Sequence, residues 1–274
     1  MDFKNKTVFI TGASRGIGLE IAKKLASLGA NIIIAAKTAE PHPKLQGTIF
    51  SAAEEIERLG GRALPCMVDI RDENQVFEAV EKAVATFGGI DILINNASAI
   101  QLTGTLETEM KRFDLMHGVN ARGTFLVSRA CLPHLLKSAN PHVLTLSPPL
   151  NFEARWFQHH VAYSMAKFGM SLVTLGMAAE FKGKVAFNSL WPRTIIATAA
   201  IEFAVGNADM MRNARKSSIM ADAAAAILSR DFKTCTGNYF IDDAVLAEEG
   251  VTDFTAYKVD PTIDDRSLIP DFFI

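Results

Sequence analysis

The sequence predicts an α/β fold built on a doubly wound parallel sheet between two helical layers. Short apolar runs recur along the 274 residues, and segments with helical spacing of apolar side chains separate them. Strands that are apolar at every position are typical of a parallel sheet covered on both faces. Their alternation with helices implies right-handed crossovers. A glycine-rich turn after the first expected strand is the third observation. Together they predict one three-layer domain of the Rossmann type over residues 1–274.

The expected elements follow one another in a regular order. Strands are predicted at residues 7–11, 31–36, 63–68, 90–94, 143–146, 185–190 and 238–241. Helices are predicted at residues 16–28, 52–59, 73–87, 124–136 and 162–181. Gly29, the pair Gly60-Gly61 and the pair Gly88-Gly89 follow the first three helices as stop signals. Residues 242–274 are acidic with weak periodicity, so we expect a tail that lies on the surface.

Composition excludes several classes of partner. A formal net charge of −2 gives no electrostatic reason to expect nucleic acid or an anionic membrane. No apolar run approaches the ~20 residues that span a bilayer, and the polar start of the chain does not resemble a signal peptide. Cys66, Cys131 and Cys235 are scattered and odd in number, which fits the cytoplasm or another reducing compartment. The six histidines have no ligand spacing, so no metal is expected.

A phosphate-binding turn is predicted between the first strand and the first helix. The segment Thr11-Gly12-Ala13-Ser14-Arg15-Gly16-Ile17-Gly18 spaces its glycines as G-x-x-x-G-x-G. Glycine lets the backbone approach a ligand closely, and the free N–H groups of a helix start favour a pyrophosphate. A glycine cluster alone indicates only a tight turn, but its place at the first strand–helix junction predicts a dinucleotide site. The contacting residues are expected to be Gly12, Ser14, Arg15, Gly16, Ile17 and Gly18.

The end of the second strand predicts which dinucleotide binds. A carboxylate is expected there if the ribose keeps its free 2′-hydroxyl. Ala36 holds that position, Lys37 follows it, and Arg15 lies in the glycine turn. A missing carboxylate and two cations suit a 2′-phosphate, so NADP(H) is predicted in preference to NAD. His42 and Lys44 either assist or belong to a solvated proline-rich loop.

Further motifs, in order along the chain, resemble the short-chain dehydrogenase/reductase family. They are Asp69 after the third strand, Asn95-Asn96-Ala97-Ser98, Asn120, Tyr163-Ser164-Met165-Ala166-Lys167, and Asn188-Ser189-Leu190-Trp191-Pro192-Arg193. Segments 35–50, 99–100, 146–151 and 270–273 are similar to a hydroxysteroid dehydrogenase-like group of that family. Longer members of this group add a sterol-carrier domain, which this chain is expected to lack. The resemblance implies further cofactor contacts from Asp69, Ile70, Asn96, Ala97, Ser98, Tyr163, Lys167, Pro192 and Thr194.

Tyr163 and Lys167 are the predicted reactive pair. They are four residues apart on a helix and therefore share a face. A tyrosine has a pKa of about 10, which a nearby ammonium lowers. The pair can then exchange a proton with a carbonyl or hydroxyl oxygen. The resemblance implies that Lys167 also holds the nicotinamide ribose and that Asn120 anchors a water molecule that supplies protons.

The catalytic serine of the family has no clear counterpart. Leu150 stands 13 residues before Tyr163, where the family usually has the serine, and alignment by the strand end gives Pro148 instead. Ser147 is the nearest candidate and is predicted to take the role if the insertion at 152–160 returns it to place. Otherwise the substrate-polarising hydroxyl is missing and turnover is slow or absent.

The substrate is expected to be an apolar, lipid-like carbonyl or hydroxyl compound. Segments 152–157 and 197–211 usually form the substrate wall, and here they hold Phe152, Trp156, Phe157, Phe203, Val205, Met210 and Met211. The alternative is that these side chains belong to the core. Arg193 either reaches the cofactor or faces solvent. The predicted function is an NADP-dependent oxidoreductase. The alternative is a degenerate dinucleotide-binding sensor or interaction protein with little turnover. A homodimer or homotetramer is expected, with helix 124–136 as a candidate interface.

Overall fold

The computed structural model describes residues 1–41, 46–199, 201 and 208–274. His42, Lys44, Phe203 and Val205, which the sequence placed near the cofactor or the substrate, lie outside the described residues.

Seven parallel strands form the centre of the fold, in the order β3-β2-β1-β4-β5-β6-β7. They are β1 (Thr7–Thr11), β2 (Asn31–Ala36), β3 (Arg62–Met67), β4 (Ile92–Asn95), β5 (His142–Thr145), β6 (Ala186–Trp191) and β7 (Tyr239–Ile241). The chain winds outward from β1 to β3, crosses back to place β4 beside β1, and then winds the other way. The strand order therefore reverses between β1 and β4, which is where ligands bind in such sheets. The predicted Rossmann-type sheet is confirmed.

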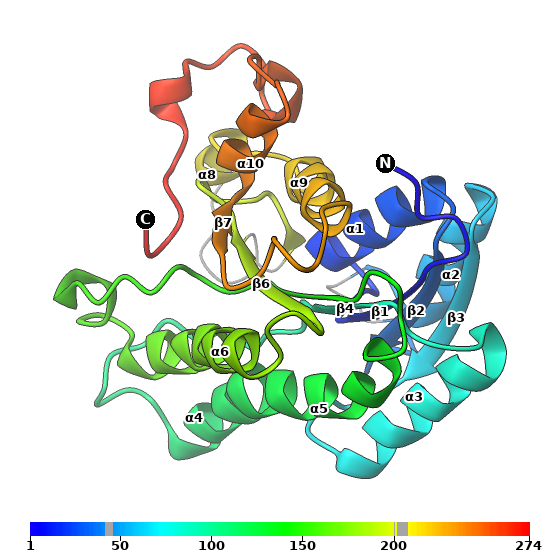
Figure 1. The fold of residues 1–274 in the computed structure, drawn as a ribbon. Coiled ribbons are helices and arrows are strands. Elements are labelled where there is room, and N and C mark those ends of the chain that lie inside the picture. The colour runs from blue at the N-terminus through cyan, green and yellow to red at the C-terminus, as the bar shows by residue number, and fades with distance from the viewer. Residues whose placement is uncertain (42–45, 200, 202–207) are drawn as a thin grey trace.

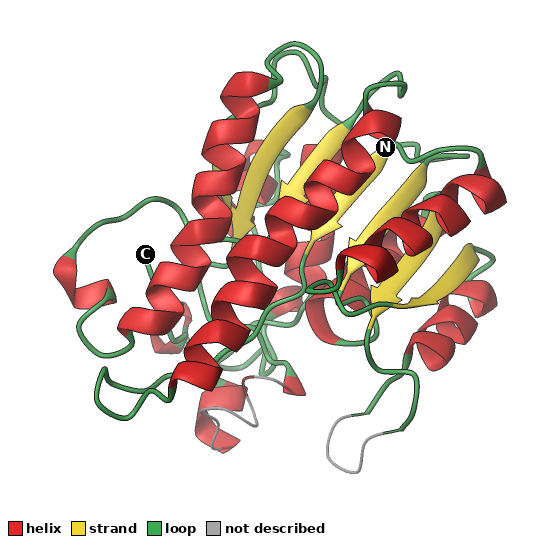
Figure 2. Cartoon of the chain, turned by 90° about the horizontal axis from the view of Figure 1, so that it is seen from below, coloured by secondary structure: helices red, strands yellow, loops and turns green. Residues whose placement is uncertain are grey.

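Helices cover both faces of the sheet, as Figures 1 and 2 show. They are α1 (Gly16–Ser27), α2 (Ile49–Arg58), α3 (Glu73–Phe87), α4 (Met110–His117), α5 (Gly123–Leu135), α6 (Val161–Glu180), α8 (Ala208–Arg212), α9 (Ser218–Leu228) and α10 (Asp242–Glu248). One apolar core joins the sheet to α1, α2 and α9, and a second joins its other face to α3, α5 and α6.

The predicted boundaries are accurate where the local signals are strong. β1, β2 and α3 match their predicted ranges residue for residue. α2 begins three residues earlier than predicted, because Thr48 caps it. The Thr48 hydroxyl accepts from the Ser51 N–H at 3.1 Å, and the Ser51 hydroxyl accepts from the Thr48 N–H at 2.8 Å. α9 was not predicted, because nine of its eleven residues are buried and its sequence has no polar face.

The C-terminal region differs from the expected surface tail. It starts as α10, and its last residues return towards the sheet, as the red segment of Figure 1 shows. Phe273 is fully buried in a third apolar cluster with Trp191 and Phe168. Weak periodicity misled the prediction, since a segment that is neither helix nor strand leaves no periodic signal even where it packs into the core.

α6 is the longest helix described, and it carries the predicted reactive pair. By length and composition alone it is apolar enough to cross a membrane, but 61% of that stretch is buried within the fold. Its apolar character is therefore that of a helix packed against the sheet, where it contacts β5 and β6.

Candidate functional site

Two adjoining hollows lie where the strand order reverses. The outer cleft has a volume of about 450 Å³, and the inner hollow has about 180 Å³. Both are lined by Ile17, Asn96, Ser98 and Thr198, so they form one continuous site. The outer cleft brings together most of the residues predicted to bind the cofactor: Gly12, Ser14, Arg15, Gly16, Ile17, Lys37, Asp69, Ile70, Asn96, Ala97 and Ser98. The inner hollow brings Tyr163, Lys167 and Pro192 together.

The glycine turn leaves backbone donors free at one wall of the outer cleft. α1 begins at Gly16, and its N-cap residue Arg15 makes no side-chain capping bond. The first N–H groups of the helix therefore have no intrahelical partner and suit an anion. Gly12 has a φ of +68°, and a Cβ there would lie 2.9 Å from the Ala97 Cα. This cradle fits a phosphate group that approaches the backbone closely.

Gly18 has a packing role in this turn and is not among the residues that line the cleft. A Cβ on Gly18 would collide with the Asn96 side-chain nitrogen and lie 2.8 Å from the Gly12 oxygen. The Asn96 nitrogen donates to Thr11 O at 2.9 Å and to Gly12 O at 3.1 Å. Gly18 thus allows Asn96 to join the ends of β1 and β4 beneath the turn.

Cations outnumber carboxylates at the far end of the outer cleft. Asp69 pairs with Lys37 at 3.0 Å and with Arg71 at 2.6 Å. Hydrogen bonds from Arg71, with help from Lys37, hold the pKa of the Asp69 carboxyl well below its usual range. Arg15 donates to Gly47 O at 2.6 Å, and its buried Nε has no partner among the described residues. Three guanidinium or ammonium groups therefore face one carboxylate.

Arg71 was missed by the sequence reasoning, and it changes the surroundings of Asp69. Its guanidinium occupies both carboxylate oxygens of Asp69. The Asp69 backbone N–H also donates to Gln75 Oε1 at 2.9 Å. A cofactor base must therefore contact this residue alongside an existing ion pair. No motif in the sequence singles out Arg71, because its partner is set by the turn after β3.

Tyr163 and Lys167 lie one turn apart on α6 with both side chains buried. Lys167 Nζ donates to Leu146 O at 2.7 Å and lies 4.9 Å from the centre of the Trp191 ring. The Tyr163 hydroxyl has no hydrogen-bond partner among the described residues. Burial raises the pKa of Tyr163 well above its ordinary value, and burial lowers the pKa of Lys167 to about 7. The pKa values of both groups should therefore change strongly when a ligand brings a charge or a hydrogen bond close to them.

Asn120 lies in a π-helical turn between α4 and α5, at Gly118–Arg122. Its amide is fully buried, accepts from the Ala99 N–H at 2.7 Å and donates to Ala99 O at 3.0 Å. Asn120 therefore fixes the backbone directly after Ser98, which lines both hollows. Such π-turns are frequent at functional sites.

The structure does not bring Ser147 into the inner hollow. Its buried hydroxyl lies 2.8 Å from the Ser189 hydroxyl, which in turn bonds Thr174 at 3.3 Å. The alternatives considered from the sequence, Pro148 and Leu150, carry no hydroxyl. The loop after β5 therefore contributes only Leu146 to the lining of the hollow.

Asp271 and Phe272 complete the inner hollow from the C-terminal segment, and sequence reasoning missed both as site residues. The segment 270–273 was noted only for its resemblance to relatives. It reaches the site because the Asp271 N–H donates to Arg193 O at 3.0 Å and Trp191 Nε1 donates to Phe272 O at 2.8 Å. These residues are about a hundred positions from Tyr163 in the sequence, so no local sequence pattern predicts that they share a site.

Arg193 takes the second of the two roles considered for it, because its side chain is exposed and lines neither hollow. Its Nε donates to both oxygens of Asp243 at 2.7 Å, so the side chain faces α10. Thr194, predicted as a cofactor contact, is buried beside Pro270 in a bridge with the C-terminal segment and lines neither hollow. Both residues hold the end of the chain in place.

The apolar lining of the inner hollow also differs from the expectation. Trp156 and Phe157 pack with Phe168 and Phe273 in the third apolar cluster, and Phe152 also contacts Phe168. None of the three lines the hollow. Its apolar lining residues are Ile17, Ile100, Leu146, Trp191, Pro192, Ile196, Ile201, Met220 and Phe272.

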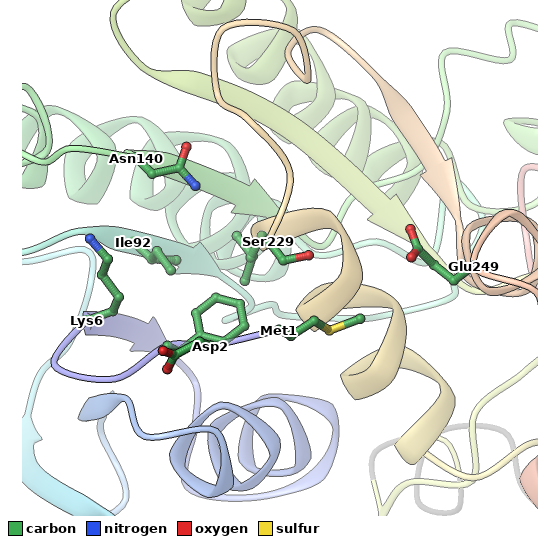
Figure 3. Close-up of a pocket in the computed structure, with 9 residues that line it drawn as sticks. Met1, Asp2, Lys6, Ile92, Asn140, Ser229 and Glu249 are labelled. Carbon is green, nitrogen blue, oxygen red and sulfur yellow. The ribbon is translucent and has the colours of Figure 1, made fainter.

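A separate pocket of about 490 Å³ lies at the opposite edge of the sheet (Figure 3). Lys6, Ile92 and Asn140 lie at or just before the starts of β1, β4 and β5. In open parallel sheets, ligands bind at the carboxyl ends of the strands. The position of this pocket therefore sets it apart from the site at the strand ends.

The comparisons with known proteins agree with this geometry. The sequence model of the short chain dehydrogenase family matches residues 6–205. Hydroxysteroid dehydrogenase-like protein 2 of Danio rerio is 59% identical over 268 residues, which cover 98% of this chain and 63% of that protein. The chain thus spans less than two thirds of the length of this relative. The similarity to the hydroxysteroid dehydrogenase-like group is confirmed.

Two crystal structures share the whole fold. One, of a protein from Xanthomonas campestris, has a TM-score of 0.96 and 55% identity, covering 100% of this chain and 99% of that one. The other, of a short chain dehydrogenase from Mycobacterium thermoresistibile, has a TM-score of 0.94 and 49% identity, covering 100% and 96%.

Proposed function

The chain belongs to the short chain dehydrogenase family of oxidoreductases, and from that premise we propose that it is an NADP-dependent enzyme interconverting a carbonyl and a hydroxyl group on an apolar, lipid-like substrate. Members of the family bind a nicotinamide dinucleotide. One observation carries the proposal: a cleft with uncapped helix donors and excess cations leads directly to a buried tyrosine–lysine pair.

The outer cleft fits the dinucleotide in two places. The free N–H groups at the start of α1 would hold the pyrophosphate. At the adenosine end, Lys37, Arg71 and Arg15 together carry two more charges than Asp69 neutralises. That excess suits a 2′-phosphate, which carries a charge of nearly −2, and β2 ends in Ala36 rather than in a carboxylate that would repel it.

The inner hollow supplies the proton. When bound, the reduced cofactor would supply a hydride to the carbonyl carbon. The electron pair of the C=O bond then moves to oxygen, which takes the proton of the Tyr163 hydroxyl. Lys167 lies one turn away and stabilises the resulting phenolate, lowering the pKa that burial raises. Asn120 keeps the turn after Ser98 in place.

The apolar lining supports the proposed substrate class. Ile100, Leu146, Ile196 and Met220 offer no strong hydrogen-bond partner, so a hydrocarbon group gains most from entering the hollow. The small volume indicates that only the reacting end of a long substrate lies inside.

The cofactor preference is tested by titration with NADPH and with NADH, following nicotinamide fluorescence. Wild type is expected to bind NADPH more tightly, and Lys37→Ala is expected to reduce that preference by at least about tenfold, since one lost charge–phosphate contact is worth about 1.5–3 kcal/mol. Lys182→Ala, an exposed lysine after α6, is the matched control. Equal affinity for both cofactors in wild type would refute the NADP assignment.

The catalytic assignment is tested with a panel of apolar ketones and aldehydes in the presence of NADPH. Tyr163→Phe is expected to lower turnover by at least 100-fold while leaving the fold intact, because the hydroxyl has no structural hydrogen bond within the described chain. An active Tyr163→Phe variant contradicts the assignment.

The displaced Ser147 favours a second candidate function. A chain without the substrate-polarising hydroxyl can bind the dinucleotide as a sensor with little turnover. The same two experiments separate these functions: a sensor binds NADPH but consumes none with any compound of the panel.

We also propose a homodimer or homotetramer. Phe125 on α5 and Leu172 and Leu175 on α6 are about half exposed, which is unusual for large apolar side chains. Light scattering after gel filtration tests this assembly, and a monomer at micromolar concentration contradicts it.

A further inference from the structure

The Asp271 carboxyl is one of three ionisable groups that line the inner hollow. It lines this hollow together with Tyr163 and Lys167. One of its oxygens, Oδ1, accepts from the Phe272 N–H at 2.7 Å. The other oxygen has no hydrogen-bond partner among the residues that the structure describes. A carboxyl with one oxygen held and the other free beside a reactive tyrosine is available to a substrate.

Backbone and side-chain bonds hold Asp271 in its position. Its own N–H donates to Arg193 O, and Ile195 N–H donates to Ile269 O at 3.0 Å, so the segment lies along the chain that follows β6. Arg193 is fixed in turn by Asp243.

The neighbours of Asp271 anchor it from the other side. Phe272 O accepts from Trp191 Nε1, and the Phe273 ring lies 5.9 Å from the Trp191 ring and 5.3 Å from the Phe168 ring. The carboxyl is therefore carried by a packed segment, and a small change in its position would disturb the core.

The loop after β5 brings no side-chain hydrogen-bond donor to the hollow. Ser147 faces Ser189, and the loop after β5 offers only Leu146. In the proposed reaction, negative charge develops on the substrate oxygen next to Tyr163. Such charge is best stabilised by a donor that is already in position.

We propose that Asp271 is a further catalytic residue, whose protonated carboxyl donates a hydrogen bond to the substrate oxygen that Tyr163 protonates. This rests on the proposed function. Asp271 keeps its proton throughout: the hydride bonds to the carbonyl carbon, the C=O electron pair moves to oxygen, and the proton that oxygen gains comes from Tyr163. The carboxyl thus takes the part for which Ser147 is not placed.

Burial favours the neutral form of the Asp271 carboxyl. Burial, with a smaller contribution from Asp242 at the start of α10, raises the pKa of Asp271 to about 7, although the Phe272 N–H and Lys167 on α6 oppose this shift. Tyr163 is uncharged near neutrality. A carboxylic acid kept neutral in an apolar site can act as a donor, as in other enzymes that stabilise an oxyanion.

The first test needs no turnover. The chain has only three tyrosines, so phenolate absorbance against pH resolves Tyr163 by subtraction of the Tyr163→Phe variant. At the alkaline pH where tyrosines titrate, Asp271 is ionised and adds to the effect of burial in raising the pKa of Tyr163. Asp271→Asn is therefore expected to lower the midpoint of the Tyr163 titration, whereas Asp264→Asn, in the exposed part of the same region, leaves it unchanged. An unmoved midpoint in Asp271→Asn overturns the proposal.

The second test separates a donor from a packing group. Asp271→Leu removes the donor at similar size and is expected to lower kcat/KM for carbonyl reduction about 100-fold. Asp271→Asn keeps an N–H donor and is expected to stay within about fivefold of wild type. NADPH affinity is expected to be the same in all three proteins. If Asp271→Leu reduces carbonyls as fast as wild type, Asp271 is not catalytic. Failure of wild type to bind NADPH refutes the proposed function instead, and the tyrosine titration still decides whether Asp271 faces Tyr163.

Discussion

Replacing Gly18 by alanine tests whether the packing beneath the phosphate turn is as tight as the structure indicates. A Cβ there collides with the Asn96 side chain and lies 2.8 Å from the Gly12 oxygen. Asn96 must then give up its bonds to Thr11 O and Gly12 O, each worth about 1 kcal/mol. Pushing the backbone apart costs about 2 kcal/mol more, and the better helix propensity of alanine returns about 1 kcal/mol. The net expectation is a loss of about 3 kcal/mol in the free energy of unfolding.

Urea unfolding followed by circular dichroism measures this loss. With a slope of about 3 kcal/mol per molar urea, the midpoint should fall by about 1 M. Gly176→Ala is the matched control, because Gly176 also lies in a helix, α6, but a Cβ there meets nothing within 4 Å. That variant should gain up to about 1 kcal/mol. Equal midpoints for the two variants would refute the reasoning, since helix propensity alone would then account for both.

Three further changes have expected outcomes. Phe273→Ala should release the C-terminal segment and lower the free energy of unfolding by up to about 3–5 kcal/mol. It should also red-shift tryptophan emission, because both tryptophans pack against that ring. An unchanged spectrum would contradict this expectation. Burial lowers the pKa of His142 from 6.5 to about 4. The free energy of unfolding is therefore highest above pH 6.5, where the ring is neutral in both states, and falls by about 3 kcal/mol as the pH decreases towards 4. Unfolding at pH 7 and pH 4.5 should show a smaller difference in His142→Gln than in wild type, whereas replacing the exposed His159 should not change it. Thr48→Ala removes the cap of α2 and should cost about 0.5–2 kcal/mol in the same urea assay; no loss would mean that the cap is replaced by water.

The parts of the site that sequence could predict are those set by a single element. The glycine turn follows directly from the junction of β1 and α1, and the spacing of Tyr163 and Lys167 follows from one turn of α6. In each case the geometry of a regular element fixes which side chains share a face. Their placement at one continuous site is accordingly well predicted.

Ser147 shows where this reasoning ends. Its distance from Tyr163 in the sequence makes it the nearest candidate, but the direction of a side chain in the loop after β5 depends on what the loop packs against. Ser189 on the neighbouring strand gives the hydroxyl a buried partner. The contributions of Arg71 and Asp271 likewise depend on contacts between segments that no local pattern relates.

The late position of Asp271 in the chain sets an order of events during synthesis. The first four strands and the glycine turn are complete once Asn96 has been made, whereas the inner hollow lacks a wall until residue 271 has been added. At about 5–20 residues per second, the 175 residues between them take roughly 10–35 s. The glycine turn and the strands beside it are therefore synthesised well before the inner hollow receives its last wall.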